Sequence, residues 1–471
     1  MKYNRNNPCT VYLCTVYPKI VTFVFCCCLF SITNAQTKQW TLEKCIQYAI
    51  DHNITIKQIA LEKESAEVEL NTAQMSRLPN LNANAGQTWD LGYSPGKSGV
   101  NASQTQANTS FSIVSSMPLF TGFRIPNEIE KNKLELKAAT ENLEKAKEDL
   151  ALNIASLFLQ ALFNKELVKI NEEQLNLSQK QVDRTNILVN VGKVPKSQLY
   201  DIESQVAKDE VSLLQAKNDL ELALLDLRQS LELENDISFD IYTPEIEDVI
   251  SEYMNSVQPP KIIFNNAVNI KPVIKEQQYR VQSAEKTLKI AESGYLPSLS
   301  LNLGYNTAYY HIYDLKQMNP ETGEMDPANN TAFSKQFSEN GREYIGLSLS
   351  IPIFNRYSVR NQVRSAKLNI QNRQLALDNT KKTLFKEIQT AYLNATAAQE
   401  KYRAAGKAVD AGAESFRYAR ERYETGKSSV FEFNEARTKL IQSRGEQVQA
   451  KYDYIFRTKI LDFYNGIPIK L

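Results

Sequence analysis

The sequence predicts a mixed α/β chain in which one unit of long heptad helices and amphipathic strands occurs twice. Short motifs recur 234 positions apart: Pro118-Leu119-Phe120 returns as Pro352-Ile353-Phe354, and Val191-Gly192-Lys193 returns as Thr425-Gly426-Lys427. Apolar residues recur every seven positions before both glycine motifs, a spacing typical of supercoiled helices. The repeat is longer than those of common solenoids, so it indicates a two-fold duplication of long coiled-coil units.

The first 35 residues have the pattern of a secretory signal peptide. Basic residues precede an apolar stretch from Ile20 to Ile32, and small residues stand just before Gln36, where a signal peptidase would cut. A membrane anchor is the alternative interpretation, but this stretch is shorter than the ~20 residues that a spanning helix needs. Five of the six cysteines lie in this leader, so Cys45 is expected to be an unpaired core residue.

The first copy, residues 36–235, is predicted to contain a helix, two strands, a long helix and a return helix. The expected bounds are 41–77 for the first helix, 81–91 and 107–117 for the strands, and 126–190 for the long helix. Pro118 is expected to end the second strand, and residues 92–106 to form a turn-rich loop. At 1.5 Å per residue the long helix would extend for about 100 Å.

The second copy, residues 261–471, is predicted to repeat this order after a proline-containing linker at 236–260. Its expected elements are a helix at 262–293 interrupted near Pro272, strands at 298–306 and 345–351, a polar loop at 314–340, and a second pair of long helices. Leu296-Pro297 ends its first helix as Leu78-Pro79 ends that of the first copy.

The strands are the main indication of a membrane protein. Each has an aliphatic or aromatic face and a face of Ser, Asn and Gly, and no segment after the leader is apolar enough for a transmembrane helix. Four strands are too few to close a barrel. Twelve strands from three chains would enclose a water-filled bore, whereas eight strands from two would nearly fill with side chains. A small sheet that caps a coiled coil is the alternative.

The composition excludes several other classes of protein. Formal net charge is +1, which implies no general attraction to nucleic acid. Neither histidine, His52 or His311, has neighbours at metal-ligand spacing, and there is no phosphate-binding loop or nucleophile elbow. We therefore expect neither an enzyme nor a cofactor or metal site.

Along nearly its whole mature length the chain resembles TolC-type outer-membrane efflux proteins. The resemblance rests on the paired Leu-Pro and Pro-Leu/Ile-Phe motifs, the two glycine turns, and most specifically the stretch from Tyr423 to Phe433, which reads YETGKSSVFEF. It implies a homotrimer with a twelve-stranded barrel in outer-membrane lipid and an α-helical periplasmic barrel. It also implies an exit channel that works with a periplasmic adaptor and an inner-membrane transporter.

The resemblance also assigns candidate roles to residues at the helix turns. Gly192 and Lys193, with Gly426 and Lys427, would form tips that meet the adaptor, although each glycine is also explained by the need to end a helix at positive φ. Glu432 and Glu435 share a helix face and would form a ring of six carboxylates that narrows the pore and attracts cations. Solvated surface charges are the simpler interpretation.

Tyr423 matches a tyrosine that helps to hold the closed state of the family's channels. Here Ser428 and Gln198 stand where the better-known members have an arginine and an aspartate, so a charged latch is not expected. A hydrogen bond between Tyr423 and Gln198 would be a candidate gate contact, and packing at a heptad position is the interpretation that we favour for Tyr423.

Two functional alternatives stay open at this level. A duct for one-step protein secretion would have the same fold. A periplasmic coiled-coil tether without a pore would explain the heptads and the leader, but not the four amphipathic strands.

Overall fold

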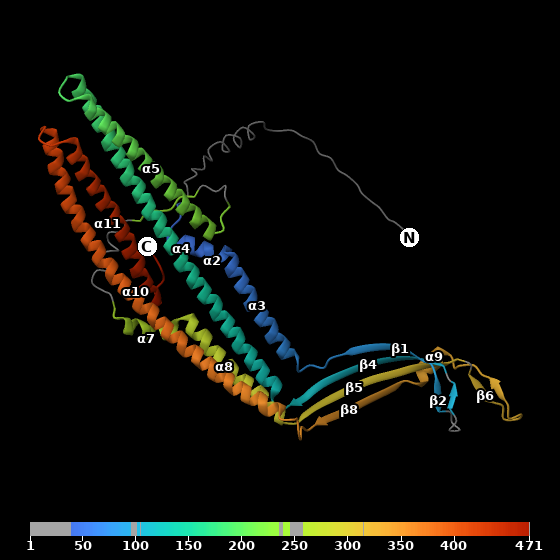
Figure 1. The fold of residues 1–471 in the computed structure, drawn as a ribbon. Helices are drawn as coiled ribbons and strands as arrows, with labels where there is room; N and C mark the ends of the chain where they lie inside the picture. Colours follow the sequence, from blue (N-terminus) through green and yellow to red (C-terminus); the bar gives the residue numbers. More distant parts are fainter. Residues whose placement is uncertain are drawn as a thin grey trace, which may run out of the picture.

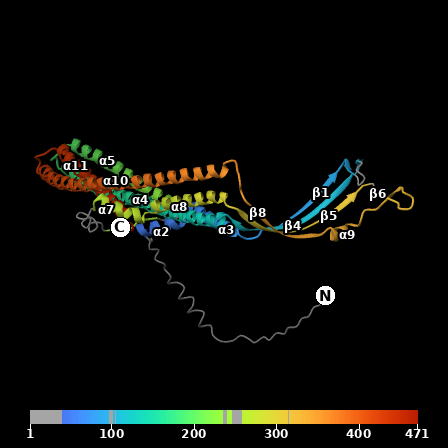
Figure 2. The same cartoon turned by 90° about the horizontal axis from the view of Figure 1, so that it is seen from below.

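The computed structural model describes residues 39–95, 101–103, 105–234, 239–244, 258–313 and 315–470. The predicted signal peptide at 1–35 lies outside these residues, as does most of the predicted linker at 236–260. The described chain has two regions: a bundle of long helices, and a curved antiparallel sheet that extends from one end of the bundle (Figure 1; Figure 2 gives the view from below).

The two copies contain long helices of equal length. Helix α4 (Arg124–Asn190) and helix α10 (Ser358–Glu424) have 67 residues each, and the return helices α5 (Lys196–Ser230) and α11 (Val430–Tyr464) have 35 each. Each return helix packs against its own long helix, and α11 also contacts α4. Many of the predicted heptad positions are buried; examples are Ile129, Ile154, Leu377, Leu384 and Ile388.

Shorter helices lie beside the sheet-proximal half of the long ones. The first copy has α2 (Leu42–His52) and α3 (Ile54–Met75), and the second has α7 (Pro260–Ile270) and α8 (Pro272–Glu292), followed by the short η1 (Ser293–Tyr295). The interruption near Pro272 was predicted, because the residue before proline avoids the helical region.

A single first helix from 41 to 77 was wrong. The chain leaves helical geometry at Asn53, whose ψ is 130°. The side-chain oxygen of Asn53 accepts hydrogen bonds from the backbone N–H groups of Thr55 (2.9 Å) and Ile56 (3.2 Å). These bonds cap the start of α3, a role for which asparagine is well suited.

The four predicted strands form one sheet in the order β1-β4-β5-β8, with all neighbours antiparallel. Their bounds are Asn82–Asp90 for β1, Gln106–Thr121 for β4, Ser298–Ile312 for β5 and Arg342–Ser350 for β8. The expected end of the second strand at Pro118 was wrong. Because the register shifts between Pro118 and Phe120, a bulge accommodates the missing N–H and the strand continues.

The segments that were expected to be loops contain further short elements. Between β1 and β4 lie the paired strands β2 (Tyr93–Pro95) and β3 (Asn101–Ser103). The expected polar loop at 314–340 contains the hairpin of β6 (Lys316–Met318) and β7 (Met325–Pro327), and helix α9 (Phe333–Glu339), which packs on β5. Apolar residues within this polar segment, Phe333 and Phe337, are the signal that sequence analysis missed.

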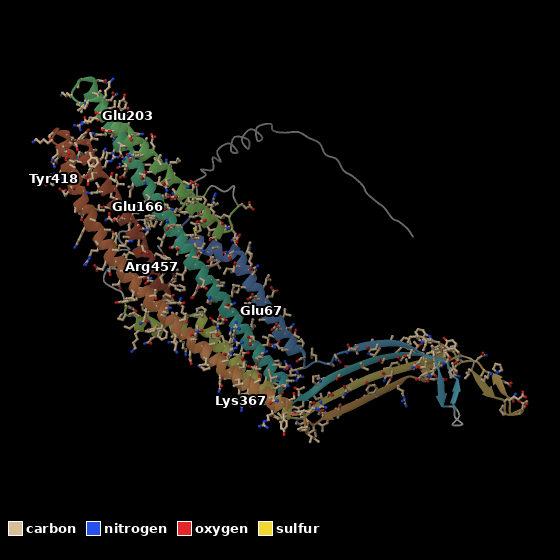
Figure 3. All side chains as sticks on the ribbon, in the orientation of Figure 1. Glu67, Glu166, Glu203, Lys367, Tyr418 and Arg457 are labelled. Atoms are coloured by element: carbon tan, nitrogen blue, oxygen red, sulfur yellow. The ribbon has the colours of Figure 1, made fainter. Side chains whose placement is uncertain are left out.

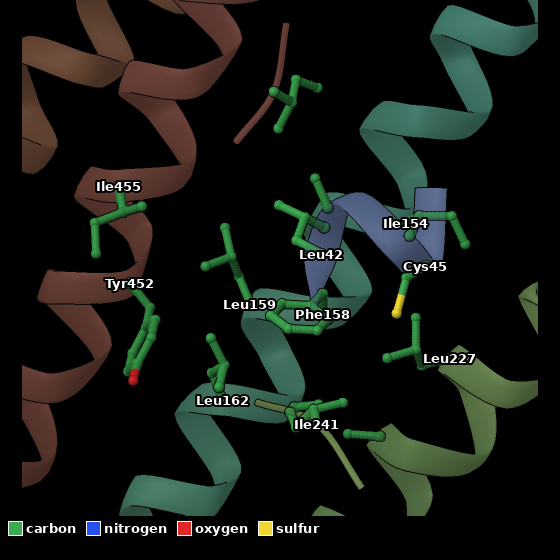
Figure 4. Close-up of a cluster of buried hydrophobic side chains, with 14 of the residues drawn as sticks. Leu42, Cys45, Ile154, Phe158, Leu159, Leu162, Leu227, Ile241, Tyr452 and Ile455 are labelled. Atoms are coloured by element: carbon green, nitrogen blue, oxygen red, sulfur yellow. The ribbon is translucent and has the colours of Figure 1, made fainter. Parts of the chain in front are cut away.

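The largest hydrophobic core lies midway along the bundle, where α2, α4, α5 and α11 meet (Figure 4). Phe158, Ile154 and Leu162 of α4 are at most 1% exposed and pack beside Leu42 and Cys45 of α2. Cys45 is an unpaired core residue, as expected, and burial raises the pKa of its thiol to about 12. Ile241, one of the few described residues of the linker region, joins this core and forms a β-bridge with Trp40.

Candidate functional site

The bundle ends, opposite the sheet, in two helix turns of the same geometry. Gly192 and Gly426 both have φ of +74°, in the left-handed region that favours glycine. A Cβ added at either position would meet nothing within 4 Å. Both glycines therefore face open space, and within one chain only the backbone conformation constrains these two positions.

Matching hydrogen bonds close the two turns. The N–H of Lys193 donates to the carbonyl of Leu188 (2.9 Å), and the N–H of Lys427 donates to the carbonyl of Arg422 (2.8 Å). Bonds of this length and span end a helix at a glycine in the Schellman pattern. Both lysines are exposed, so each tip carries a positive charge into solvent.

Glu432 lies in the first turn of α11, where a negative charge suits the helix dipole. Its N–H donates to the Ser429 hydroxyl (3.2 Å), and its carboxylate accepts a hydrogen bond from the Ser428 hydroxyl (2.9 Å). Arg422 lies 3.8 Å from the same carboxylate. Ser428, which stands where the better-known members of the family have an arginine, thus bonds to Glu432 of its own chain.

Glu435 is one turn further along α11 and pairs with Lys439 at 2.7 Å. Both of these carboxylates are about half exposed in the single chain. Glu435 also lines a groove of about 590 Å³ between α5 and α11, together with Phe431 and Lys208. The two glutamates share one face of α11, as their spacing predicts.

Tyr423 packs rather than bonding to Gln198. Its ring stacks on the ring of the buried Phe433, with centroids 5.0 Å apart and planes at 25°. Phe416 meets the same ring at 5.5 Å, so aromatic contacts hold α10 against α11 near the tip. No hydrogen bond joins Tyr423 to Gln198 in the described structure, and the side-chain oxygen of Gln198 is shielded from solvent without a partner.

An exposed ion pair connects the two helix hairpins near their tips. Arg184 of α4 lies 3.0 Å from Glu424 of α10, and both side chains are more than 40% exposed. Pairs of this exposure contribute about 0–1 kcal/mol, so this contact alone does not hold the hairpins together.

A buried charged pair joins the same hairpins further from the tips. The Arg437 guanidinium of α11 donates to the Asp209 carboxylate of α5 at 2.7 Å, and the side chains are 2% and 8% exposed. Gln205 of α5 donates to the other carboxylate oxygen at 2.9 Å. Gln174 of α4 completes the cluster, because its amide oxygen can accept from Nε of Arg437 at 2.6 Å. Burial lowers the pKa of Arg437, and the Asp209 carboxylate opposes this effect.

Sequence analysis missed this cluster, although a signal was present. Asp209 stands seven residues after the buried Ile202 and seven before the buried Ala216, and Arg437 stands seven after the buried Val430. A charged residue at a heptad core position needs a buried partner. Two such residues of opposite sign could have been singled out from the sequence as needing buried partners, but the approach of α5 to α11 that brings them together could not.

A second groove, of about 580 Å³, lies between α4, α10 and α11. Basic side chains outnumber acidic ones in its lining. The basic residues are Lys180, Arg417, Arg420, Arg437 and Arg444, and the acidic residues are Glu173 and Glu414. Charged side chains also lie on the outside of the bundle, as Glu203 of α5 and Glu67 of α3 illustrate (Figure 3). The surface of the bundle is therefore suited to water, and its grooves to polar partners.

Two features are absent from the described residues: a metal-binding cluster and a helix that could cross a membrane. No group of three or more His, Cys, Asp or Glu side chains there could hold a metal ion. None of the helices in the same ranges combines the length and apolar character that crossing a membrane requires.

Comparison with known proteins gives matches over most of the chain. The sequence model described as "Outer membrane efflux protein" matches residues 45–232 and 264–459. The outer membrane protein TolC of Escherichia coli K12 is 22% identical over 407 residues, which are 86% of this chain and 77% of that one. The cation efflux system protein CusC of the same strain is 22% identical over 420 residues, 86% of this chain and 82% of its own.

Solved structures match the fold at lower identity. A crystal structure of CusC superposes with a TM-score of 0.73 at 18% identity and covers 93% of this chain and 96% of that chain. The outer membrane channel CmeC of Campylobacter jejuni gives a TM-score of 0.71 at 18% identity, with 90% and 85% covered. The open-state MtrE channel of Neisseria gonorrhoeae gives 0.68 at 17%, with 90% and 88% covered.

Proposed function

The chain belongs to the outer membrane efflux protein family, and from this premise we propose that it is the exit channel of a tripartite efflux system. In this role it passively conducts small solutes, drugs among them, that an inner-membrane pump and a periplasmic adaptor deliver. The predicted resemblance and the predicted location, the outer membrane with a large periplasmic helical portion, are confirmed by the family and its members.

One observation supports this proposal most strongly: the sheet is incomplete in a single chain. Its edge strands, β1 and β8, each have one unpaired side, and all or nearly all of their residues are exposed. Unpaired edges invite association with further strands. Three copies would supply twelve strands, enough to enclose a bore, whereas the four of one chain cannot close. We therefore propose a homotrimer.

The two faces of the sheet suit a barrel in outer-membrane lipid. One face carries Leu299, Leu301 and Leu303 of β5, opposite Leu349, Leu347 and Ile345 of β8. The three residues of β8 are 61–80% exposed in the single chain. The other face carries Ser300, Asn302 and their partners Ser348 and Gly346. An apolar band outside and a polar lumen inside are the pattern of barrels that span membranes.

The helix tips are the proposed contact with the adaptor. Gly192 and Lys193, with Gly426 and Lys427, form two exposed turns of equal geometry at the end of the bundle, as described above. The groove between α5 and α11 begins close to these turns, at Asp201 and Val430. A helical partner that approached the tips would meet both turns and this groove.

Glu432 and Glu435 are the proposed constriction. Three chains would bring six carboxylates to the inner end of the pore, and such a ring favours cations over anions. In the single chain both carboxylates also have a basic neighbour, which reduces the net field that they can exert.

Tyr423 and Gln198 remain proposed gate contacts, with different roles. Tyr423 holds α10 to α11 through its stacking on Phe433. The amide oxygen of Gln198 is shielded from solvent and has no partner in the described chain, so it could gain a hydrogen bond only when the helices around it shift. A gate of this kind depends on packing and neutral hydrogen bonds rather than on charge.

The test of the function is to purify the mature protein and measure its assembly and conductance. We expect a detergent-dependent trimer that opens steady water-filled pores in planar lipid bilayers. A monomer that stays soluble without detergent would contradict the proposal and favour a periplasmic tether. Small-solute export is separated from protein secretion by the cargo: deletion should sensitise cells to toxic small molecules and leave the set of secreted proteins unchanged.

A further inference from the structure

A small apolar groove lies midway along the sheet, far from the helix tips, around Ala83, Ile113 and Tyr305. Its volume is about 320 Å³, and strands β1, β4 and β5 form it together with helix α9. Its apolar lining residues are Ala83, Ala85, Phe111, Ile113, Tyr305 and Phe337. No charged side chain lines it, which distinguishes it from the grooves of the helical bundle.

Strand register explains why a groove forms here. Ala85 of the edge strand pairs with Phe111, Ala83 pairs with Ile113, and Ile113 in turn pairs with Tyr305. Directly paired side chains stand on the same face of a sheet. Two small side chains on β1 thus lie beside large ones on β4 and β5, and the difference in height leaves a channel on the face that carries the exposed leucines of β5 and β8.

Helix α9 closes one side of this channel and is firmly held. Gln336 bonds to both the N–H and the carbonyl of Tyr310, at 3.0 and 2.9 Å, and the Thr307 hydroxyl donates to the carbonyl of Phe337 at 2.7 Å. The rings of Phe337 and Phe111 lie 5.5 Å apart, nearly edge to face. The wall that Phe337 provides therefore exists before any ligand arrives.

We propose that this groove holds an acyl chain of a lipid in the outer leaflet of the outer membrane. The proposal rests on the proposed barrel, because only then does the apolar face meet hydrocarbon. Helix α9 lies at the end of the sheet away from the bundle (Figure 1), which is the outer end if the bundle is periplasmic. A volume at the low end of the range for ligand pockets suits part of one chain and not a headgroup.

The groove is tested with the full mature protein in phosphatidylcholine vesicles whose lipid carries a diazirine on one acyl chain. After illumination, peptides that contain Ala85 and Phe111 should be labelled roughly fivefold more than the β8 peptide with Ile345 and Leu347, because a held chain stays longer than a passing one. The β8 residues are the internal control, since they share the apolar face but are not among the residues that line this groove.

Three variants distinguish binding in the groove from general contact of lipid with the apolar face. Ala85→Trp fills the channel and should remove the excess labelling, while Thr88→Trp, on the opposite face of the same strand, should leave it unchanged. Phe337→Ala removes a wall without adding bulk, so it should lower the excess even if the first variant folds poorly. Equal labelling of the groove peptides and the β8 peptide would overturn the acyl-chain proposal but not the barrel. Labelling of β8 with none at the groove would also overturn it, and would indicate that a neighbouring subunit covers the groove. No labelling on any strand would overturn the barrel as well.

Discussion

The helical bundle and the sheet of this protein differ in how much of their apolar surface a single chain buries. In the bundle, long helices pack on return helices, and residues such as Phe158, Leu227 and Ile388 are at most 1% exposed. In the sheet, every residue of β1 is exposed and Ile345 of β8 is 80% exposed. The bundle therefore has a hydrophobic core within one chain, whereas the edge strands of the sheet leave their apolar side chains exposed, as the proposed barrel in lipid would require.

The largest expected effect is on the apolar face of the sheet. An arginine in place of Leu347 would cost about 2–4 kcal/mol at the middle of a bilayer, and a trimer would bear this cost three times. If the proposed trimer migrates as a heat-sensitive band in outer-membrane fractions, Leu347→Arg should abolish that band. Ser348→Arg, on the neighbouring residue of the opposite face, should still assemble. If both variants assemble equally well, the assignment of faces is wrong.

The bundle is most sensitive at its buried charged pair. Arg437→Leu leaves the Asp209 carboxylate buried without its partner, which costs about 3–5 kcal/mol. We expect a clear drop in the urea midpoint of unfolding, measured in detergent. The double variant D209L/R437L should recover most of the loss, because neither charge then remains buried.

The exposed pair provides the matched control for this change. Arg184→Leu removes a partner of Glu424 and should alter stability by about 0–1 kcal/mol. If Arg184→Leu lowers the stability as much as Arg437→Leu does, then burial does not explain the difference that we expect between the two ion pairs.

The tip turns should respond in function more than in stability. Gly426→Leu places a side chain at positive φ and costs about 1–2 kcal/mol, but it has free space, so the trimer should persist while resistance to toxic solutes is lost. Gly426→Asn tolerates this backbone conformation and adds less bulk, and it should retain part of the resistance. Loss of the trimer in Gly426→Leu would instead assign the glycine a folding role.

The smallest expected effect is on ion selectivity. The double change E432Q/E435Q removes six carboxylates from the proposed constriction and should lower cation over anion selectivity in planar bilayers by roughly twofold to fivefold. Glu203→Gln, on the exposed surface of the return helix α5, is the control. Unchanged selectivity in the double variant would remove these two glutamates from the pore.

Several features of the site could be predicted from the sequence because they depend on local rules. The glycine turns follow from residues that end a helix, and the shared face of Glu432 and Glu435 follows from a three-residue spacing. The break at Asn53 and the extension of β4 past Pro118 were missed, because a side-chain cap and a bulge overrode the periodic pattern. Helix α9 was missed because seven residues are too few to show a period.

The sequence by itself determined that the chain is duplicated, which of its longer segments are helices and strands, and which face of the four main strands is apolar. These properties depend on the spacing of residue types along the chain. Only the tertiary structure decided that Arg437 meets Asp209 across two hairpins, that Tyr423 stacks on Phe433 without reaching Gln198, and that α9 closes a groove on the sheet. Such contacts join residues far apart in the chain, and their geometry is set by how whole helices and strands pack, which no local spacing encodes.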